Sequence, residues 1–226
     1  MGRRHLAYNL GWKLGLVVTG RAAGPLLDSY EEERLPVARR LLVTTDRAFS
    51  LVVSENALAA LIRTKVVAKV AALAMTSHRV QEFMFGTISQ IGIQYRDSTL
   101  SEELPGLPET APQAGERFPW MQLALHPGGG IEDLYAALDD TRFTLLLFGQ
   151  DAPVGAVARL GDLLRIHAIS SASPNDRELA RVQVPEPSFY LIRPDGYIAL
   201  AGLHLAEAEL QGYLADRLHL VSLRTR

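Results

Sequence analysis

The chain has 226 residues, of which 48% are apolar and 21% are charged, with a net charge of −2 and no cysteine. This composition indicates a globular chain with a sizeable core, arranged as one large domain or two small ones. The near-neutral charge gives no electrostatic basis for binding nucleic acid or an anionic membrane. The lack of cysteine excludes disulfides, thiolate metal sites and dithiol redox chemistry.

The first segment of the chain reads as a helix that ends at Gly20 or Gly24, because glycine adopts the backbone angles that end helices. Most of its circumference is apolar, and such a helix requires cover on all sides. We therefore expect it to drive self-association or to dock on a partner, unless it folds back onto the helical pattern near Val66. The two apolar stripes are Leu6, Leu10, Leu14 and Val17, and Tyr8, Trp12 and Leu16, and the internal alternative is Val66, Val70 and Leu73.

A second helix follows, which begins either at Ser29 or nearer Leu26. Ser29 and Glu32 have the spacing of a capping box, and Pro36 should kink the helix or begin the next one. The charged run 31–40 (Glu31, Glu32, Glu33, Arg34, Arg39 and Arg40) reads as a solvated helix face with local ion pairs. Apolar residues at helical spacing predict another helix over 58–73, and a further one covers 79–89. Basic residues inside the stretch 57–75 exclude it as a membrane span.

Prolines then break the pattern, because they can continue neither a helix nor a central strand. The residues concerned are Pro105, Pro108, Pro112 and Pro119, with Gly106 and Gly115 between them. We predict a proline-rich linker over 97–117 between two domains.

Strand signals dominate the C-terminal part. An apolar run, Thr144–Phe148, predicts a buried strand, and Asp195-Gly196 between two apolar runs predicts a hairpin. The full expectation is a strand at 122–126, helix 131–138, strand 144–148, helix 154–164, strand 165–169, hairpin strands 189–192 and 197–200, and helix 207–218. This order is typical of an α/β domain of the thioredoxin type, which carries a cis-proline before its final hairpin, here Pro185 or Pro187.

Several segments together resemble the FAD-dependent aromatic-ring hydroxylases, the single-component flavoprotein monooxygenases. They are Asn9-Leu10-Gly11-Trp12-Lys13-Leu14, Leu26–Ala38, Tyr95–Ser101, Gly115-Glu116-Arg117, and the closing hairpin Tyr190–Ala199. Many members of this family carry a C-terminal thioredoxin-like domain. The resemblance implies a helical remainder of the monooxygenase main body over 1–96, the linker over 97–117, and a thioredoxin-like domain over 118–226.

The same resemblance implies a function. The chain would be the C-terminal portion of an FAD- and NADPH-dependent aromatic (phenol-type) monooxygenase, located in the cytoplasm. The sequence lacks the Gly-x-Gly-x-x-Gly loop, the Gly-Asp segment and the Gly-Met-Asn stretch of that family, and Met1–Leu6 depart from its pattern, which implies a misassigned start, a frameshift or a truncation. We therefore expect no cofactor on this chain alone and no activity of its own.

The resemblance places Asn9 and Trp12 behind the flavin site, and we assign no catalytic, cofactor-binding or metal residue. The expected partner is a missing FAD domain or a second copy, as in a dimer. The alternative hypothesis is a noncatalytic thioredoxin-like association module.

Other chemistry is weakly signalled. Gly128-Gly129-Gly130 before a helix could bind phosphate, but no Lys-Ser/Thr follows and a turn is favoured. The six histidines (His5, His78, His126, His167, His204 and His219) lack metal-ligand spacing. His167 lies in an apolar strand and reads as a core histidine, and Ser170-Ser171 beside it lack a nucleophile elbow.

Overall fold

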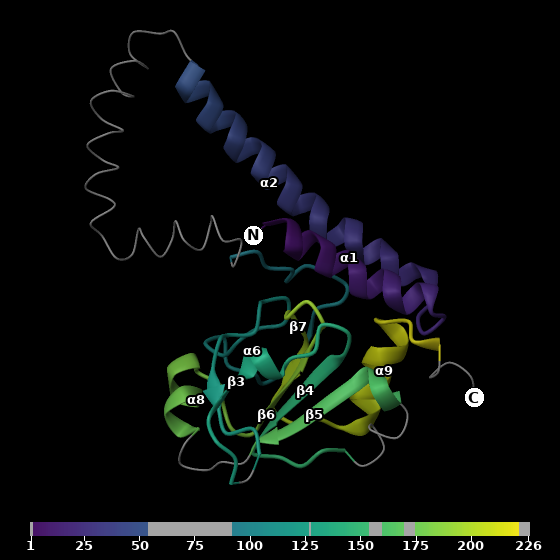
Figure 1. Ribbon diagram of the computed structural model, residues 1–226, viewed down its shortest axis with the longest axis vertical. Coiled ribbons are helices and arrows are strands. Elements are labelled where there is room, and N and C mark those ends of the chain that lie inside the picture. Colours follow the sequence, from purple (N-terminus) through teal and green to yellow (C-terminus); the bar gives the residue numbers. More distant parts are fainter. Residues whose placement is uncertain (1, 54–91, 127, 154–159, 170–174, 222–226) are drawn as a thin grey trace. The chain divides into compact units, whose positions relative to one another are not determined.

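The computed structural model describes residues 2–53, 92–126, 128–153, 160–169 and 175–221 (Figure 1). It combines a helical N-terminal segment with a mixed sheet, as the sequence predicts. The chain divides into two compact units: Met1–Gly2 with Glu32–Ile93, and Arg3–Glu31 with Gln94–Arg226. The first helix therefore belongs to the unit that contains the sheet. None of the helices in the described part of the chain has the length and apolar character that crossing a bilayer requires.

Two long helices begin the chain. Helix α1 (Gly2–Val18) ends before Gly20, which has a left-handed φ of +71°, as predicted. A short 3-10 turn, η1 (Gly24–Leu27), leads into α2 (Asp28–Val53).

Helix α2 differs from expectation in three respects. The Ser29 hydroxyl donates to the Leu26 carbonyl at 2.6 Å, so the helix has already begun and Ser29 is not its cap. The helix continues through Pro36, so a new helix does not begin there, because a proline removes only one ladder hydrogen bond and the turns on either side persist. The other alternative, a kink at Pro36, stays a prediction. Glu33 is only 3% exposed, so the charged run is not solvated throughout.

The main sheet has the order β1-β7-β6-β4-β5. Its strands are β1 (Glu102–Glu103), β4 (Phe143–Phe148), β5 (Leu164–Ile169), β6 (Ser188–Ile192) and β7 (Ile198–Gly202). Strand β4 runs parallel to β5 and antiparallel to β6, and β1 runs parallel to β7. Strands β6 and β7 form the predicted antiparallel hairpin. The predicted strands at 144–148 and 165–169 are confirmed, each one residue longer at its start.

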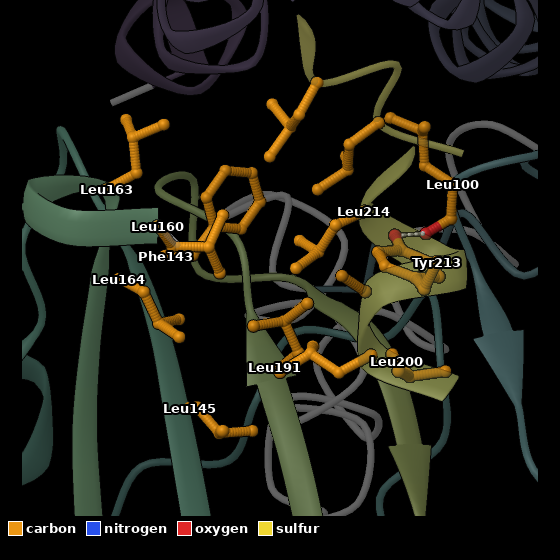
Figure 2. Close-up of a cluster of buried hydrophobic side chains, with 14 of the residues drawn as sticks. Leu100, Phe143, Leu145, Leu160, Leu163, Leu164, Leu191, Leu200, Tyr213 and Leu214 are labelled. Carbon is orange, nitrogen blue, oxygen red and sulfur yellow. Dashed lines mark hydrogen bonds between the residues drawn. The ribbon is translucent and has the colours of Figure 1, made fainter. Parts of the chain in front are cut away.

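Both faces of this sheet are buried, which explains why β4 is apolar at nearly every position. Alternate residues point to opposite faces, so Leu145 and Leu147 enter one core cluster while Leu146 and Phe148 enter the other. Figure 2 shows the first cluster, in which helix α9 (Glu207–Asp216) covers the sheet.

The second face is covered by irregular chain and short helices. The proline-rich segment contributes Leu107, Ala111 and Ala114 to this cluster, and it also carries strand β1. The short helices are α6 (Leu134–Ala137) and α8 (Asp176–Val182), and a two-stranded sheet joins β2 (Gln122–Leu123) to β3 (Glu132–Asp133).

Other expectations are corrected by the structure or lie outside the described residues. The predicted strand 122–126 is only two residues long, and the predicted helix 131–138 shrinks to α6, because β3 and an Asp133 cap occupy its first residues. Helix α8 was not predicted. Of the predicted helix 154–164, residues 154–159 lie outside the described residues and Gly161–Leu163 form a 3-10 turn, η3. The helices predicted over 58–73 and 79–89 also lie outside them. A cis peptide bond precedes Pro187, which is one of the two prolines that the sequence offered for it.

Candidate functional site

Helix α1 buries one face, which carries both polar and apolar residues, in the unit that contains the sheet. The buried residues Asn9, Trp12, Lys13 and Leu16 recur at the spacing of a single helix face, and none is more than 7% exposed. The Trp12 ring meets Phe143 edge-on at 5.5 Å between ring centroids. The two apolar stripes of this helix are thus not both buried within the chain. Trp12 and Leu16 are buried, whereas Leu14 and Tyr8 are 45% and 43% exposed.

The end of α1 is fixed to the C-terminal part of the chain through backbone hydrogen bonds. Ala23 N–H donates to the His219 carbonyl at 2.9 Å, and Val221 N–H donates to the Arg21 carbonyl at 2.9 Å. Ala22 and Leu220 form an antiparallel bridge between these segments. This pairing and the buried face hold α1 at both its middle and its end.

The Asp195 carboxylate joins α1 to the β6–β7 turn. Its Oδ2 accepts hydrogen bonds from Asn9 Nδ2 and from Trp12 Nε1, each at 3.1 Å. The Arg193 guanidinium donates from Nε to Oδ1 at 2.9 Å and from Nη2 to Oδ2 at 2.7 Å, a bidentate ion pair. The side chains of Arg193 and Asp195 are 0% and 3% exposed. A buried carboxylate with four donors is thus the centre of this junction.

Aromatic rings surround the buried guanidinium. The Arg193 Cζ lies 5.4 Å from the ring centroid of Trp12 and 5.5 Å from those of Tyr95 and Tyr197. The two tyrosine rings lie 4.5 Å apart. Ring faces carry negative potential, which favours a cation in this position. Burial raises the pKa of the Tyr197 hydroxyl well above its ordinary value, so this ring stays neutral.

Two further segments of the family resemblance, those that contain Tyr95 and Gly115, meet at the same junction. Tyr95 N–H donates to the Gly115 carbonyl at 2.7 Å, and Gly115 N–H donates to the Ile198 carbonyl at 2.8 Å. Gly115 has a φ of +81°, and an added Cβ would lie 2.5 Å from the Tyr95 carbonyl. Only glycine allows this approach. The function of these segments in this chain is therefore to connect α1, the proline-rich segment and the hairpin.

Sequence reasoning does not predict this ion pair. The turn signal assigns Arg193 and Asp195 only to a hairpin, and the family resemblance places Asn9 and Trp12 behind a flavin site without giving them a partner in this chain. Charged residues within a turn are usually solvated, so nothing local predicts that these are buried. The one available signal is their position: the turn is flanked by strands whose residues are all buried.

Among the described residues there is no group of three or more potential metal ligands. His167 is 7% exposed, and its ring lies 5.8 Å from that of His126. Neither ring nitrogen of His167 has a hydrogen-bond partner in the described part of the chain. Burial lowers the pKa of His167, and the nearby His126 and Arg165 lower it further. Ser170 and Ser171 lie outside the described residues.

The residues present do not fit a complete FAD site. The sequence has no Gly-x-Gly-x-x-Gly motif, and the glycine segment 128–130 leads to β3 rather than directly to a helix. The Asp133 carboxylate accepts from Tyr135 N–H at 2.8 Å and so occupies the N-terminal end of α6. A carboxylate at this position repels a pyrophosphate. We therefore assign no step of flavin chemistry to this chain's own residues.

Comparison with known proteins agrees with the sequence resemblance. Residues 111–219 match the family described as aromatic-ring hydroxylase, C-terminal, and residues 6–45 match the family described as FAD binding domain. The 6-methylpretetramide 4-monooxygenase of Streptomyces rimosus is 34% identical in an alignment 226 positions long, which covers 95% of this chain and 40% of the relative.

Solved structures give the same result. CabE, an aromatic hydroxylase from angucycline biosynthesis, superposes with a TM-score of 0.66 at 29% identity, over 95% of this chain and 40% of that one. The flavin-dependent monooxygenase PieE, solved in complex with FAD and substrate, gives a TM-score of 0.65 at 25% identity, over 95% of this chain and 43% of that one.

These matches define a class, the flavin-dependent aromatic hydroxylases, and a region within it. The chain belongs to the FAD-dependent aromatic-ring hydroxylase family and corresponds to its C-terminal portion. It spans about 40% of the length of the relatives named above.

Proposed function

We propose that this chain is the C-terminal portion of an FAD- and NADPH-dependent monooxygenase that hydroxylates a phenol-type aromatic compound. The observation that carries the proposal is the Asp195 junction. It joins α1, which lies in the segment similar to the FAD binding domain, to the hairpin, which lies in the segment similar to the hydroxylase C-terminal region. Two regions that the family combines are thus combined here by buried, specific contacts.

In this proposal the C-terminal domain, residues 118–226, is thioredoxin-like and has a structural role. A parallel pair, β4 and β5, followed by an antiparallel hairpin and a closing helix, supports that assignment. Thiol–disulfide exchange requires a thiolate nucleophile, and the chain contains no cysteine. The task of this domain would be to hold α1 in place, because Asp195 in the turn of the final hairpin binds Asn9 and Trp12 of α1.

The aromatic substrate class comes from the relatives. One of them is a 6-methylpretetramide 4-monooxygenase and another was solved with FAD and substrate. Because this chain spans about 40% of their length, we propose that the flavin and substrate groups contact residues outside the matched region. The chain alone should then neither retain FAD nor oxidise NADPH.

A chimera tests the proposal. The part of the Streptomyces rimosus relative that precedes the matched region is fused in front of this chain, and flavin content and NADPH oxidation are measured with a panel of phenols. We expect the chimera to bind FAD and to show phenol-stimulated NADPH oxidation, while the chain alone shows neither. A folded chimera that binds FAD but shows no oxidation with any phenol would contradict the proposed activity.

A further inference from the structure

His167 is a buried side chain with two unsatisfied ring nitrogens. It lies in β5, the last strand in the order of the main sheet, and it pairs with Leu146 of β4. Paired residues point to the same face of a sheet, so His167 shares the face of the second core cluster with Leu146. A neutral imidazole has one donor and one acceptor, and leaving both unpaired in the interior is costly. The two unpaired nitrogens therefore point to a ligand that the protein itself does not supply.

A second imidazole lies against the first. The rings of His126 and His167 have centroids 5.8 Å apart and planes inclined by 45°. His126 is exposed, so the pair extends from the buried edge of the sheet to solvent. Because a metal–nitrogen bond is about 2.0–2.1 Å long, the centroid of a bound imidazole lies about 3 Å from the ion. Two imidazoles that share one ion can thus have centroids up to about 6 Å apart, and the observed pair is within this limit.

The backbone that carries His126 is held in place on both sides. Before it, the Asn175 side chain accepts from Ala124 N–H at 2.8 Å and donates to the Ala124 carbonyl at 3.2 Å. After it, Gly129 N–H donates to the His126 carbonyl at 3.0 Å. An added Cβ at Gly129 would lie 3.1 Å from that carbonyl oxygen, so glycine is what allows this close turn. The glycine segment 128–130 therefore fixes the position of His126.

The charges around the pair favour a cation over an anion. Glu132 of β3 acts on His167 as a nearby negative charge. Arg165, a nearby cation, is already engaged: its Nη1 donates to the Ala137 carbonyl at 3.2 Å, and its Nη2 lies 3.8 Å from an Asp139 oxygen. Near neutral pH an imidazole is largely uncharged and can bind a metal ion through a nitrogen lone pair.

We propose that His126 and His167 form a binding site for a divalent transition-metal ion of the zinc class, with water completing the coordination. Imidazole nitrogen suits zinc, copper and nickel, whereas magnesium and calcium take oxygen ligands. Two protein ligands make an open site. The bound ion joins the edge strand β5 to the segment between β2 and β3, and so fastens irregular chain to the sheet. The spacing of histidines along the sequence does not reveal the site, because its two ligands come from separate segments.

Titration of the 226-residue chain with Zn²⁺ tests the site. The chain is first freed of metal with a chelator, and binding is measured by calorimetry. One Zn²⁺ should bind per chain, and Mg²⁺ and Ca²⁺ should not replace it. Loss of a residue that merely supports a ligand costs about 10–100-fold in metal affinity. His126→Gln and His167→Gln should each weaken binding at least about tenfold, whereas His204→Gln, at an exposed position, should leave it unchanged.

The nitrogen resonances of the histidine rings supply a second readout. Zn²⁺ should shift the imidazole signals of His126 and His167 together and leave that of His204 in place. Because a ligand that binds only the folded state stabilises it, Zn²⁺ should also raise the melting temperature of the unmodified chain. It should not do so for His126→Gln. This variant alters an exposed side chain, so it tests the site even where His167→Gln disturbs the core.

Three outcomes would overturn the inference. The first is Zn²⁺ binding that His126→Gln leaves unchanged, which would place the ion elsewhere. The second is the lack of a zinc-induced shift at both imidazoles. The third is a shift of both imidazoles by inorganic phosphate but not by Zn²⁺, which would identify an anion site. None of these measurements depends on flavin or on NADPH oxidation, so the inference and the proposed function can fail separately.

Discussion

Trp12 and Asp195 lie 183 positions apart in the sequence, and the indole Nε1 of Trp12 donates a hydrogen bond of 3.1 Å to the carboxylate Oδ2 of Asp195. The same oxygen accepts from Asn9 and from Arg193. The contact makes the position of α1 depend on the turn of the closing hairpin. A change in that turn should therefore be detected in the first helix of the chain.

Replacing Asp195 by Asn should destabilise the unit by about 3–5 kcal/mol, because removing one member of a buried ion pair leaves the other charge uncompensated. The free energy of unfolding in urea measures this effect. The control is Asp162→Asn, which breaks the ion pair between Asp162 and Arg21. The side chains of Arg21 and Asp162 are 42% and 65% exposed, so this change should leave the urea midpoint unchanged. Equal midpoints for the two variants would show that the buried pair contributes nothing.

Tryptophan fluorescence should report the same change locally. The chain has two tryptophans, so Trp120→Phe leaves Trp12 as the only emitter. Trp12 is 7% exposed, and its emission should shift to the red when Asp195→Asn is added and α1 loses its anchor. The control adds Asp162→Asn to the same background, where the emission maximum should not move. An unchanged maximum with Asp195→Asn would mean that α1 stays docked without the carboxylate.

Gly115→Ala should destabilise the unit more than Gly128→Ala does. Both glycines have left-handed φ values, +81° and +74°, so alanine is strained at either position, by about 1–2 kcal/mol. At Gly115 the new Cβ would also lie 2.5 Å from the Tyr95 carbonyl, whereas at Gly128 it meets nothing within 4 Å. The difference between the two urea midpoints isolates the clash. Equal losses would show that the Tyr95 segment shifts without cost.

The sequence predicted the elements whose signals are local. The run 144–148 is continuously apolar, and the hairpin has apolar residues on both sides of the turn at Asp195-Gly196. Both form strands as expected. Strand β1 could not be predicted, because Glu102 and Glu103 gain their strand character only by pairing with β7, about a hundred residues later. Helix α8 is short and polar at most positions, so its periodicity gave no signal.

The junction shows the same division between local and long-range information. That α1 is helical follows from its own residues, but which face it buries depends on what lies opposite. The two apolar stripes of its sequence favour no single face, whereas the structure buries Asn9 and Lys13 beside the apolar residues Trp12 and Leu16. Asn9 is buried because the Asp195 carboxylate of the distant hairpin accepts its hydrogen bond, and the Lys13 ammonium lies 5.6 Å from the ring centroid of Trp12 in the same helix. Pairings of this kind cannot be deduced from the periodicity of one helix.

The purified 226-residue chain should be colourless. Since neither a Gly-x-Gly-x-x-Gly loop nor a free helix end at α6 offers a pyrophosphate site, FAD should dissociate during gel filtration. Absorbance near the flavin maximum, divided by protein concentration, measures the retained cofactor. The chimera described above is the control for flavin incorporation. One flavin per chain after gel filtration of the 226-residue chain would contradict both the prediction and the interpretation of its residues.

The stability of the unit should fall as the solution becomes acidic, and His167 should account for part of the fall. Burial lowers its pKa in the folded state, His126 and Arg165 lower it further, and Glu132 opposes them. The unfolded chain then binds the proton more readily, so stability is complete above the unfolded pKa of about 6.5 and is lost as the pH falls below it.

His167→Gln removes this titration and should flatten the dependence of the unfolding free energy on pH below about 6.5, whatever its effect at neutral pH. The matched control is His204→Gln, at an exposed position, which should keep the slope of the unmodified chain. Urea unfolding curves at a series of pH values measure both slopes. If His167→Gln retains the full acid slope, the proton is taken up elsewhere, and the buried imidazole does not govern the acid stability of this sheet.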